Sequence, residues 1–216
     1  MDMHRNNPLP HPIPPLGRAM KRALDLTFAI GGITALGWLI MAAWLVATID
    51  TGTNGLFVQD RVGRNGTRFR VIKIRTMRES TKITTTVTTS ADERITPIGR
   101  ILRLTRIDEL PQLINVLIGD MSLVGPRPDV PGWADRLEGD DRVILCVRPG
   151  ITGLATLHFR DEAQLLADQT NPERFNREVI WPTKVRLNRQ YLQHWCLTND
   201  LRIIARTLIP GRAGSS

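Results

Sequence analysis

The longest apolar run in the sequence predicts one long helix near the N-terminus. Leu26–Ile49 contains 24 residues and no charge, and a helix of that length measures about 36 Å, enough for the roughly 30 Å core of a bilayer. Residues 1–17 hold five of the fourteen prolines without apolar periodicity, which predicts a disordered or extended leader. We therefore expect a leader at 1–17, a membrane helix at 18–50 and a folded domain at 51–210. The alternative for the apolar run is a buried helix of a soluble protein.

Basic residues flank the apolar run on both sides. Arg18, Lys21 and Arg22 precede it, and a cluster within residues 61–70 follows it. The positive-inside rule places both ends in the cytoplasm, which a single straight crossing cannot satisfy. The pattern favours a re-entrant helix that bends and returns to the same side, with Gly31-Gly32 and Gly37-Trp38 as candidate bend positions.

In the next segment, polar and apolar residues alternate in a way that is typical of strands. Residues 56–77 form two short runs around Asn65-Gly66, which is the strongest short-range signal for a β-hairpin. Ser80–Ala91 is rich in Thr and poor in apolar bulk, which predicts a mobile surface loop. Ile98–Leu104 then predicts a short basic helix.

The stretch Thr105–Pro128 has a helical pattern that begins with two carboxylates, Asp108 and Glu109. Leu110, Leu113, Ile114 and Leu117 have the spacing of one buried helix face. Asp108 is predicted to be the helix N-cap, Pro111 falls in the first turn, and Gly119 ends the helix. Because free N–H groups and the helix dipole favour negative charge there, Asp108 is expected to be ionised at neutral pH. By itself, such a pair is most often only a cap and a first-turn acid.

Two turns and a basic tail follow. Val124–Pro128 and Arg148–Gly153 are rigid turns that each hold one arginine in place, Arg127 and Arg148. In residues 184–208, cationic and apolar side chains alternate, which fits helices on an anionic membrane surface and equally fits an amphipathic helix packed on a core. Helices outnumber strands, so we expect an α-rich α/β fold.

Charge and cysteine content narrow the classes of partner. The formal net charge of +8 indicates anionic partners such as phosphorylated substrates, anionic lipid or nucleic acid. No DNA- or RNA-binding motif accompanies that charge, so nucleic-acid binding is the minor alternative. The two cysteines, Cys146 and Cys196, lack metal-site spacing and predict neither a disulfide framework nor zinc.

Several motifs together resemble one family. KRALDL, the apolar run, QDRVGRNGTRF, KIRTM, DERITPIGRILR, DELPQLINVLIGDMSLVGPRP and RPGITG follow one another as in bacterial sugar transferases. These are the monotopic polyprenyl-phosphate phosphoglycosyl transferases, here in the small form that consists of the catalytic domain alone. The resemblance covers about Lys21 to Leu208. It implies a cytoplasmic-face domain on the inner leaflet of the bacterial inner membrane, which begins the assembly of a surface glycan.

The resemblance also implies a reaction and a set of residues. A sugar 1-phosphate passes from a nucleotide diphosphate sugar, usually a UDP-sugar, to polyprenyl phosphate, and UMP is released. Asp108 is implied as the nucleophile that forms an aspartyl-phosphosugar intermediate, and Glu109 as the Mg²⁺ ligand. Since a diphosphate repels a carboxylate, cations must neutralise it, and the candidates are Lys73, Arg75, Arg127 and Arg148. Arg148 is as well explained by an ion pair with a structural carboxylate.

The sequence departs from the family pattern in places. A Ser-Pro pair is common at the bend, where this chain has Gly37-Trp38, and Gly153–Thr156 replaces the usual residues after the second turn. Arg160 and Asp161 are candidates for reading the donor, or for an internal ion pair. A catalytically inactive interaction protein of the same fold is the remaining alternative.

Overall fold

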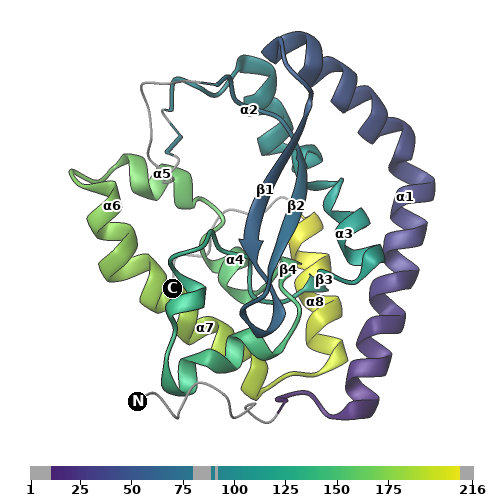
Figure 1. Cartoon of the computed structure of the whole chain (residues 1–216), viewed down its shortest axis with the longest axis vertical. Helices are drawn as coiled ribbons and strands as arrows, with labels where there is room; N and C mark the ends of the chain where they lie inside the picture. The colour runs from purple at the N-terminus through teal and green to yellow at the C-terminus, as the bar shows by residue number, and fades with distance from the viewer. Residues whose placement is uncertain (1–10, 80–88, 91, 210–216) are drawn as a thin grey trace.

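The computed structural model describes residues 11–79, 89–90 and 92–209. Within them the fold is rich in helix, as predicted, and has two short pairs of strands: the predicted hairpin and a second, parallel pair that was not predicted (Figure 1). Residues 1–10 of the predicted leader and most of the predicted Ser80–Ala91 loop lie outside the described residues. The remaining elements enclose a cavity on one side of the hairpin.

The N-terminal apolar run forms one continuous helix, α1, over Pro15–Thr51. Pro15 stands at the first helical position, where its missing N–H costs nothing, and Gly52 ends the helix with a φ of 71°. The helix therefore begins three residues before the predicted membrane segment and ends one residue after it. It is unbroken through both predicted bend positions and follows a curved path along one side of the molecule (Figure 1). Re-entry into the membrane stays a prediction.

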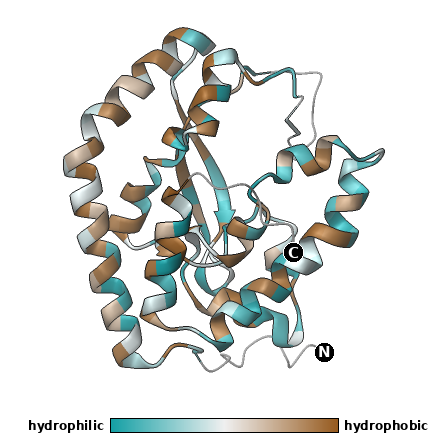
Figure 2. Cartoon of the chain, turned by 180° about the vertical axis from the view of Figure 1, so that it is seen from behind, coloured by the Kyte–Doolittle hydropathy of each residue, from teal (hydrophilic) through white to brown (hydrophobic). Residues whose placement is uncertain are grey.

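Most of α1 is not covered by the rest of the chain. Only 11% of its most apolar 18-residue window is buried, and the helix is long and apolar enough to cross a membrane. Figure 2 shows hydrophobic residues along its whole length. The alternative of a buried core helix does not fit this exposure, because a core helix is covered on most sides. One close contact explains Gly32, where an added Cβ would lie 2.9 Å from Leu113.

The predicted hairpin is confirmed. Strands β1 (Leu56–Val62) and β2 (Arg68–Ile74) pair antiparallel, with Phe57 opposite Lys73. Asn65 and Gly66 both have positive φ, 59° and 77°, as a tight hairpin turn requires. The predicted basic helix is also present as α2 (Pro97–Leu104), capped by Thr96, whose side chain accepts a hydrogen bond from Gly99.

The helix that was predicted to begin at Asp108 begins later. Asp108 lies inside a separate 3-10 turn, η2 (Ile107–Glu109), and helix α3 spans Gln112–Ile118. The prediction of Asp108 as N-cap is therefore wrong. Arg106 adopts a left-handed conformation (φ 60°) that separates η2 from α2 and sets the direction of the turn. The predicted stop at Gly119 is confirmed, since Gly119 has a φ of 99°.

The predicted buried face of α3 is only partly buried. Leu113 packs inside, but Ile114 and Leu117 are 39% and 40% exposed. The inward face instead carries Val116 and the polar Asn115, whose amide donates to the carbonyl of Arg70 (2.7 Å) and accepts from the backbone N–H of Ile72 (3.1 Å). Since β2 is a sheet edge, this side chain satisfies backbone groups that a neighbouring strand would otherwise pair.

A short parallel pair brings the two rigid turns together. Strand β3 (Ser122–Val124) pairs with β4 (Gly150–Thr152). The backbones touch so closely that a Cβ on Gly150 would lie 2.2 Å from the amide nitrogen of Gly125. Glycine is required for this approach, and the pairing carries Arg127 to the cavity.

The C-terminal part is a series of short helices around the main core. It comprises η3 (Ala134–Arg136), η4 (Gly139–Cys146), α4 (Leu154–His158), α5 (Glu162–Ala167), α6 (Pro172–Phe175), η5 (Asn176–Ile180), α7 (Trp181–Gln193) and α8 (Leu197–Leu208). The basic tail was predicted to lie either on a membrane surface or against the core. Helix α7 packs against the core, since Val185, Tyr191 and Leu192 are buried there. Helix α8 buries Ile203 and leaves Leu201 and Leu208 exposed.

A buried ion pair fixes α1 to these helices. Asp200 of α8 is fully buried and accepts hydrogen bonds from Lys21 (2.7 Å), Tyr191 (2.7 Å) and Trp195 (3.2 Å). One turn further along α1, Asp25 accepts from the hydroxyl of Ser122 (3.0 Å) and the amide of Leu123 (2.9 Å). We call the Lys21–Asp200 cluster with Tyr191 and Trp195 the α1 junction.

Candidate active site

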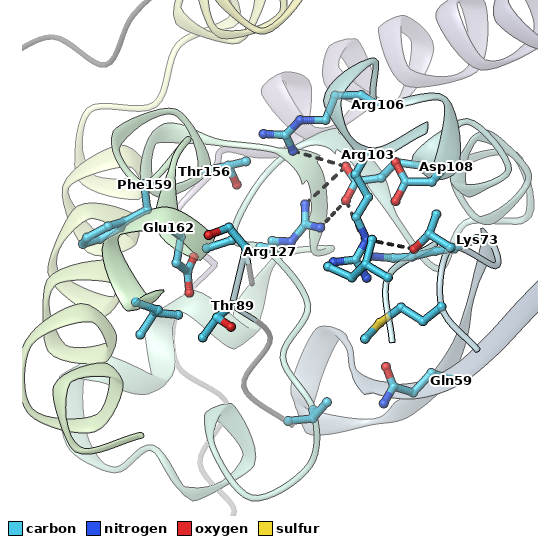
Figure 3. Close-up of a pocket in the computed structure, with 18 of the residues that line it drawn as sticks. Gln59, Lys73, Thr89, Arg103, Arg106, Asp108, Arg127, Thr156, Phe159 and Glu162 are labelled. Atoms are coloured by element: carbon cyan, nitrogen blue, oxygen red, sulfur yellow. Dashed lines mark hydrogen bonds and ion pairs between the residues drawn. The ribbon is translucent and has the colours of Figure 1, made fainter. Parts of the chain in front are cut away.

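A cavity of about 1620 Å³ lies between the hairpin, the α2–η2 segment and helices α4 to α7. Asp108 and Glu109 lie in its wall with Lys73, Arg103, Arg106 and Arg127 (Figure 3). The carboxylates come from η2, Lys73 comes from β2, and Arg127 comes from the turn after β3. Segments that are far apart in the sequence therefore place two acids among four cations.

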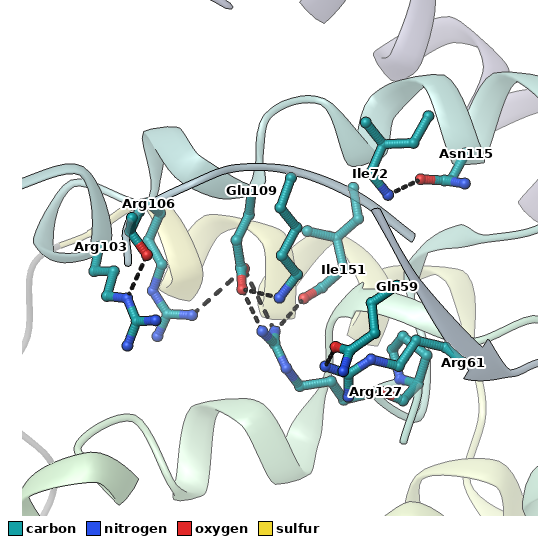
Figure 4. Close-up of polar contacts among 12 residues, drawn as sticks. Gln59, Arg61, Ile72, Arg103, Arg106, Glu109, Asn115, Arg127 and Ile151 are labelled. Atoms are coloured by element: carbon teal, nitrogen blue, oxygen red, sulfur yellow. Dashed lines mark hydrogen bonds and ion pairs between the residues drawn. The ribbon is translucent and has the colours of Figure 1, made fainter. Parts of the chain in front are cut away.

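Glu109 is held by cations on several sides. Arg127 donates to both of its carboxylate oxygens, Lys73 lies 3.5 Å from Oε1, and Arg106 lies 3.6 Å from Oε2 (Figure 4). Burial opposes ionisation, but Arg127 and Lys73 outweigh it and hold the pKa of Glu109 well below its usual range. Glu109 is therefore a permanently ionised, anchored carboxylate.

Asp108, the residue immediately before Glu109, is not held by cations in this way. It is buried, and its Oδ1 has no hydrogen-bond partner within the described residues. Burial, followed by the charge of Glu109, raises its pKa to about 6. At pH 7 the ionised form still prevails by roughly ten to one, which agrees with the predicted charge. The predicted cause is wrong, because Asp108 does not cap a helix.

Lys73 and Arg127 lie where the sequence placed them relative to the carboxylates. Burial, followed by the charge of Arg127, lowers the pKa of Lys73 to about 8. The guanidinium of Arg127 is fixed by Glu109 and by the carbonyl of Ile151 (3.3 Å). A guanidinium with this support is a preformed site for a phosphate oxygen.

The other predicted cations are placed differently. Arg75 lines the cavity, where it donates to the carbonyl of Asn54 (2.8 Å) and pairs with Glu79 (3.1 Å), away from the carboxylates. Arg148 lies outside the cavity and donates to the carbonyl of Gly119 (2.7 Å). Its contact is structural, but the partner is a backbone carbonyl and not the carboxylate that the alternative named.

Arg160 and Asp161 both line the cavity. The guanidinium of Arg160 donates to the carbonyls of Arg206 (2.5 Å) and Ile209 (3.1 Å) at the end of α8. This contact positions the C-terminal helix, so a donor-reading role for Arg160 stays a prediction.

Sequence reasoning missed Arg103 and Arg106. Arg103 donates to the hydroxyl of Thr76 (2.8 Å) and lies in the cavity wall near Asp108. Both arginines precede Asp108, at five and two residues, and that spacing was the available signal. The spacing alone does not show that these side chains reach the cavity, because that depends on the turn made by the left-handed Arg106.

The site fits Mg²⁺ only together with a substrate. Within the described ranges, no three His, Cys, Asp or Glu side chains are grouped to hold a metal by themselves. Mg²⁺ is commonly bound by one or two carboxylates together with substrate phosphates, and the unpartnered Oδ1 of Asp108 suits that arrangement. Both oxygens of Glu109, the predicted ligand, contact cations, so Glu109 would bind a metal only by releasing one. The Arg106 contact is the longest of these.

Comparison with known proteins agrees with these features. The bacterial sugar transferase family matches residues 16–211. The galactosyl transferase CpsE of Streptococcus agalactiae is 38% identical over 201 residues, which are 87% of this chain and 41% of that protein. The exopolysaccharide production protein ExoY of Sinorhizobium fredii is 31% identical over 212 residues, 91% of this chain and 87% of that protein.

A third relative is named for its reaction. The UDP-glucose:undecaprenyl-phosphate glucose-1-phosphate transferase of Caulobacter vibrioides is 35% identical over 201 residues, 87% of this chain and 68% of that protein. The chain thus spans less than half of the streptococcal relative and most of the other two. The family match covers α1, the hairpin, the carboxylate pair and both rigid turns, and the chain belongs to the bacterial sugar transferase family.

Proposed function

We propose that the protein transfers a sugar 1-phosphate from a UDP-sugar to polyprenyl phosphate, with Asp108 as the nucleophile. The observation that carries this proposal is the environment of Asp108. Its carboxylate is buried, one oxygen has no partner within the described residues, and its pKa is about 6. A nucleophile requires a free electron pair and an ionised state near neutral pH.

The proposed reaction consists of two transfers of the phosphosugar. In the first, a carboxylate oxygen of Asp108 bonds to the phosphorus that carries the sugar, the bond from that phosphorus to the bridging oxygen breaks, and UMP leaves with the electron pair. In the second, an oxygen of polyprenyl phosphate bonds to the same phosphorus, and the bond to Asp108 breaks. The carboxylate is regenerated, and the product is a polyprenyl-diphosphate sugar.

The cations explain how an anion can be attacked by an anion. Lys73, Arg103, Arg106 and Arg127 supply four positive charges in one wall, against two carboxylates. The net positive charge attracts the diphosphate and stabilises the charge on the leaving UMP. Glu109 fixes Arg127 and Lys73 in place. Mg²⁺ bound by the carboxylate pair and the diphosphate would add further neutralisation.

The names of relatives suggest the donor. One relative is named for UDP-glucose and another, from Erwinia amylovora, for UDP-galactose. We infer a neutral UDP-hexose as the donor and undecaprenyl phosphate as the acceptor, in the first membrane step of a surface polysaccharide.

The exposed apolar residues support a place on the membrane. Helix α1 exposes Phe28, Trp38 and Ile49, among others, and large apolar side chains are also exposed on neighbouring helices: Ile98, Ile101 and Leu104 of α2, and Ile114, Leu117 and Ile118 of α3. We infer that α1 is seated in the inner leaflet of the bacterial inner membrane, with the cavity on the cytoplasmic side. A lipid phosphate at the interface would then lie at the depth of the cavity.

The reaction is tested by UMP release. Detergent-extracted protein is incubated with Mg²⁺, undecaprenyl phosphate and a panel of UDP-sugars, and UMP is measured. We expect release with UDP-glucose or UDP-galactose and its loss when EDTA removes the metal. Absence of UMP with every donor would contradict the proposed reaction and favour the inactive interaction protein.

The topology of α1 is tested by labelling. Cys146 and Cys196 are free thiols, so they are first replaced by serine. Single cysteines at His11 and Thr53, at the two ends of α1, are then labelled with a membrane-impermeant reagent from each side. Labelling of both from the cytoplasmic side supports re-entry, and labelling from opposite sides shows a helix that spans the membrane.

A further inference from the structure

The cavity has a second wall, which the chemistry proposed above does not use. It lies across Arg127 from Asp108 and Lys73, and it carries Thr156, Phe159 and Glu162 (Figure 3). Lys184 completes it. We call these four residues the far wall. They come from α4, its C-terminal end, α5 and α7, so the fold places them together from three helices.

An ion pair lies at the centre of the far wall. Lys184 Nζ lies 2.7 Å from Oε1 of Glu162, and the two side chains are only 19% and 30% exposed. The ammonium also lies 5.9 Å from the ring centroid of Phe159. Because a carboxylate can accept about four hydrogen bonds, one ammonium leaves Glu162 with capacity for a ligand.

A buried hydroxyl adds a second polar group. Thr156 lines the cavity, and its Oγ1 is buried without a hydrogen-bond partner in the described part of the chain. Such a group destabilises the fold unless a ligand satisfies it. An aromatic ring, a carboxylate and a free hydroxyl that converge in a cavity can bind a polyhydroxylated ring, since the ring covers the apolar face and the polar groups pair with its hydroxyls.

The position of the far wall indicates which part of the donor it meets. Arg127 lies between the far wall and Asp108 (Figure 3), and it contacts Glu109. The far wall is therefore the neighbour of the phosphate-binding cations. In a nucleotide diphosphate sugar, the sugar is bonded to the phosphorus that is attacked, whereas the nucleoside lies one phosphate further away.

We propose that the far wall is the hexose subsite, in which Glu162 accepts a hydrogen bond from one sugar hydroxyl and Thr156 pairs with another. The assignment rests on the proposed function and narrows the donor to neutral hexoses. A uronic acid would bring a third carboxylate beside Glu162 and Asp129, which lines the same cavity. Lys184 already pairs with Glu162. The guanidinium of Arg160, which also lines the cavity, donates to the carbonyls of Arg206 and Ile209.

The test compares Glu162→Gln with wild type across hydroxyl-deleted donors. The kcat/KM for UMP release is measured with the UDP-hexose that wild type prefers and with its 2-, 3-, 4- and 6-deoxy analogues. Loss of a charged hydrogen bond predicts a decrease of about 10- to 100-fold for the parent hexose. The decrease should fall to no more than about twofold for the one analogue that lacks the contacted hydroxyl. Glu178→Gln is the matched control, because Glu178 is 56% exposed and, in the part of the chain that the structure describes, pairs with Arg174 outside the cavity.

The outcomes separate the two proposals. An equal decrease for every analogue shows that Glu162 is structural and overturns the hexose subsite while the reaction stands. If Glu162→Gln lowers the melting temperature too far for assay, the near-isosteric Thr156→Val is judged on the same series by the same criterion. A wild-type protein that releases no UMP from any donor overturns the proposed function, and the subsite with it.

Discussion

The α1 junction and the carboxylate pair are both buried clusters of charge, but only one is internally satisfied. In the junction, one carboxylate, Asp200, accepts hydrogen bonds from Lys21, Tyr191 and Trp195. In the cavity, Asp108 and Glu109 lie among four cations, and Asp108 keeps an oxygen without a partner within the described residues. The junction is complete without a ligand, whereas the cavity has excess positive charge.

The difference separates a structural role from a chemical one. A buried ion pair with satisfied hydrogen bonds holds two elements in one arrangement. An unsatisfied carboxylate beside uncompensated cations costs stability, and such a cost is typical of sites that bind and react. The two adjacent acids of the cavity differ in the same way. Glu109, like Asp200, is paired with cations, whereas Asp108 keeps an oxygen without a partner within the described residues.

The largest expected effect is that of Asp108→Asn on turnover. An amide cannot replace the attacking carboxylate, so UMP release should fall on the order of 10⁴-fold or more. The fold should be retained or slightly stabilised. Burial and the charge of Glu109 raise the pKa of Asp108 in the folded state, so at pH 7 the ionised carboxylate disfavours folding relative to a neutral amide. Calorimetry with parallel UMP assays measures both, and retained turnover would remove Asp108 as the nucleophile.

Glu109→Gln should destabilise the protein, in contrast to its neighbour. The change removes the carboxylate that Arg127 and Lys73 contact in a buried site, which costs about 3–5 kcal/mol. Chemical unfolding measures this loss at pH 7. An unchanged unfolding midpoint would show that the cations do not depend on Glu109.

Asp200→Asn should destabilise the fold by about 3 kcal/mol, because Lys21 then stays buried without an anion. The cavity is untouched, so kcat/KM of the folded fraction should stay within about twofold of wild type. Urea titration and UMP assays on the same preparation check both. A large loss of activity in fully folded protein would mean that the position of α1 controls the site.

The smallest effect is the dependence of kcat/KM on pH. Asp108 must be ionised, so activity should fall as the pH drops through about 6. Lys73 must be protonated, so activity should also fall as the pH rises through about 8. Each limb approaches a tenfold change per pH unit, with a maximum near pH 7. Lys73→Arg should remove the alkaline limb, and an alkaline limb that persists would assign it to another group.

Local signals predicted much of this fold. The Asn65-Gly66 turn located the hairpin, Gly119 located the end of α3, and the uncharged run located α1. Each of these depends on backbone preferences or composition within a few residues. Lys73 and Arg127, two of the predicted phosphate-binding cations, lie beside Glu109, and their role stays a prediction.

The features that the sequence did not predict depend on packing between segments that are distant in the sequence. The spacing of Ile114 and Leu117 identified an apolar face of α3 but not whether protein or lipid covers it. The left-handed Arg106 moved Asp108 out of the predicted cap, and no residue type at that position signals it. Arg148 and Arg127 lie in similar turns, yet only Arg127 faces the cavity. The far wall joins Lys184 of α7 to three residues within 156–162, and the sequence does not show that these two segments meet.

The central claim, a covalent phosphosugar on Asp108, is tested most directly by intact-protein mass spectrometry after incubation with donor and without acceptor. A UDP-hexose should add the mass of one hexose phosphate to wild type, release one equivalent of UMP, and lose the adduct when polyprenyl phosphate is supplied. Peptide mapping should place the adduct on Asp108, and Asp108→Asn should stay unmodified. UMP release that requires the acceptor, with no adduct at any time, would contradict the account and indicate direct transfer between the two substrates.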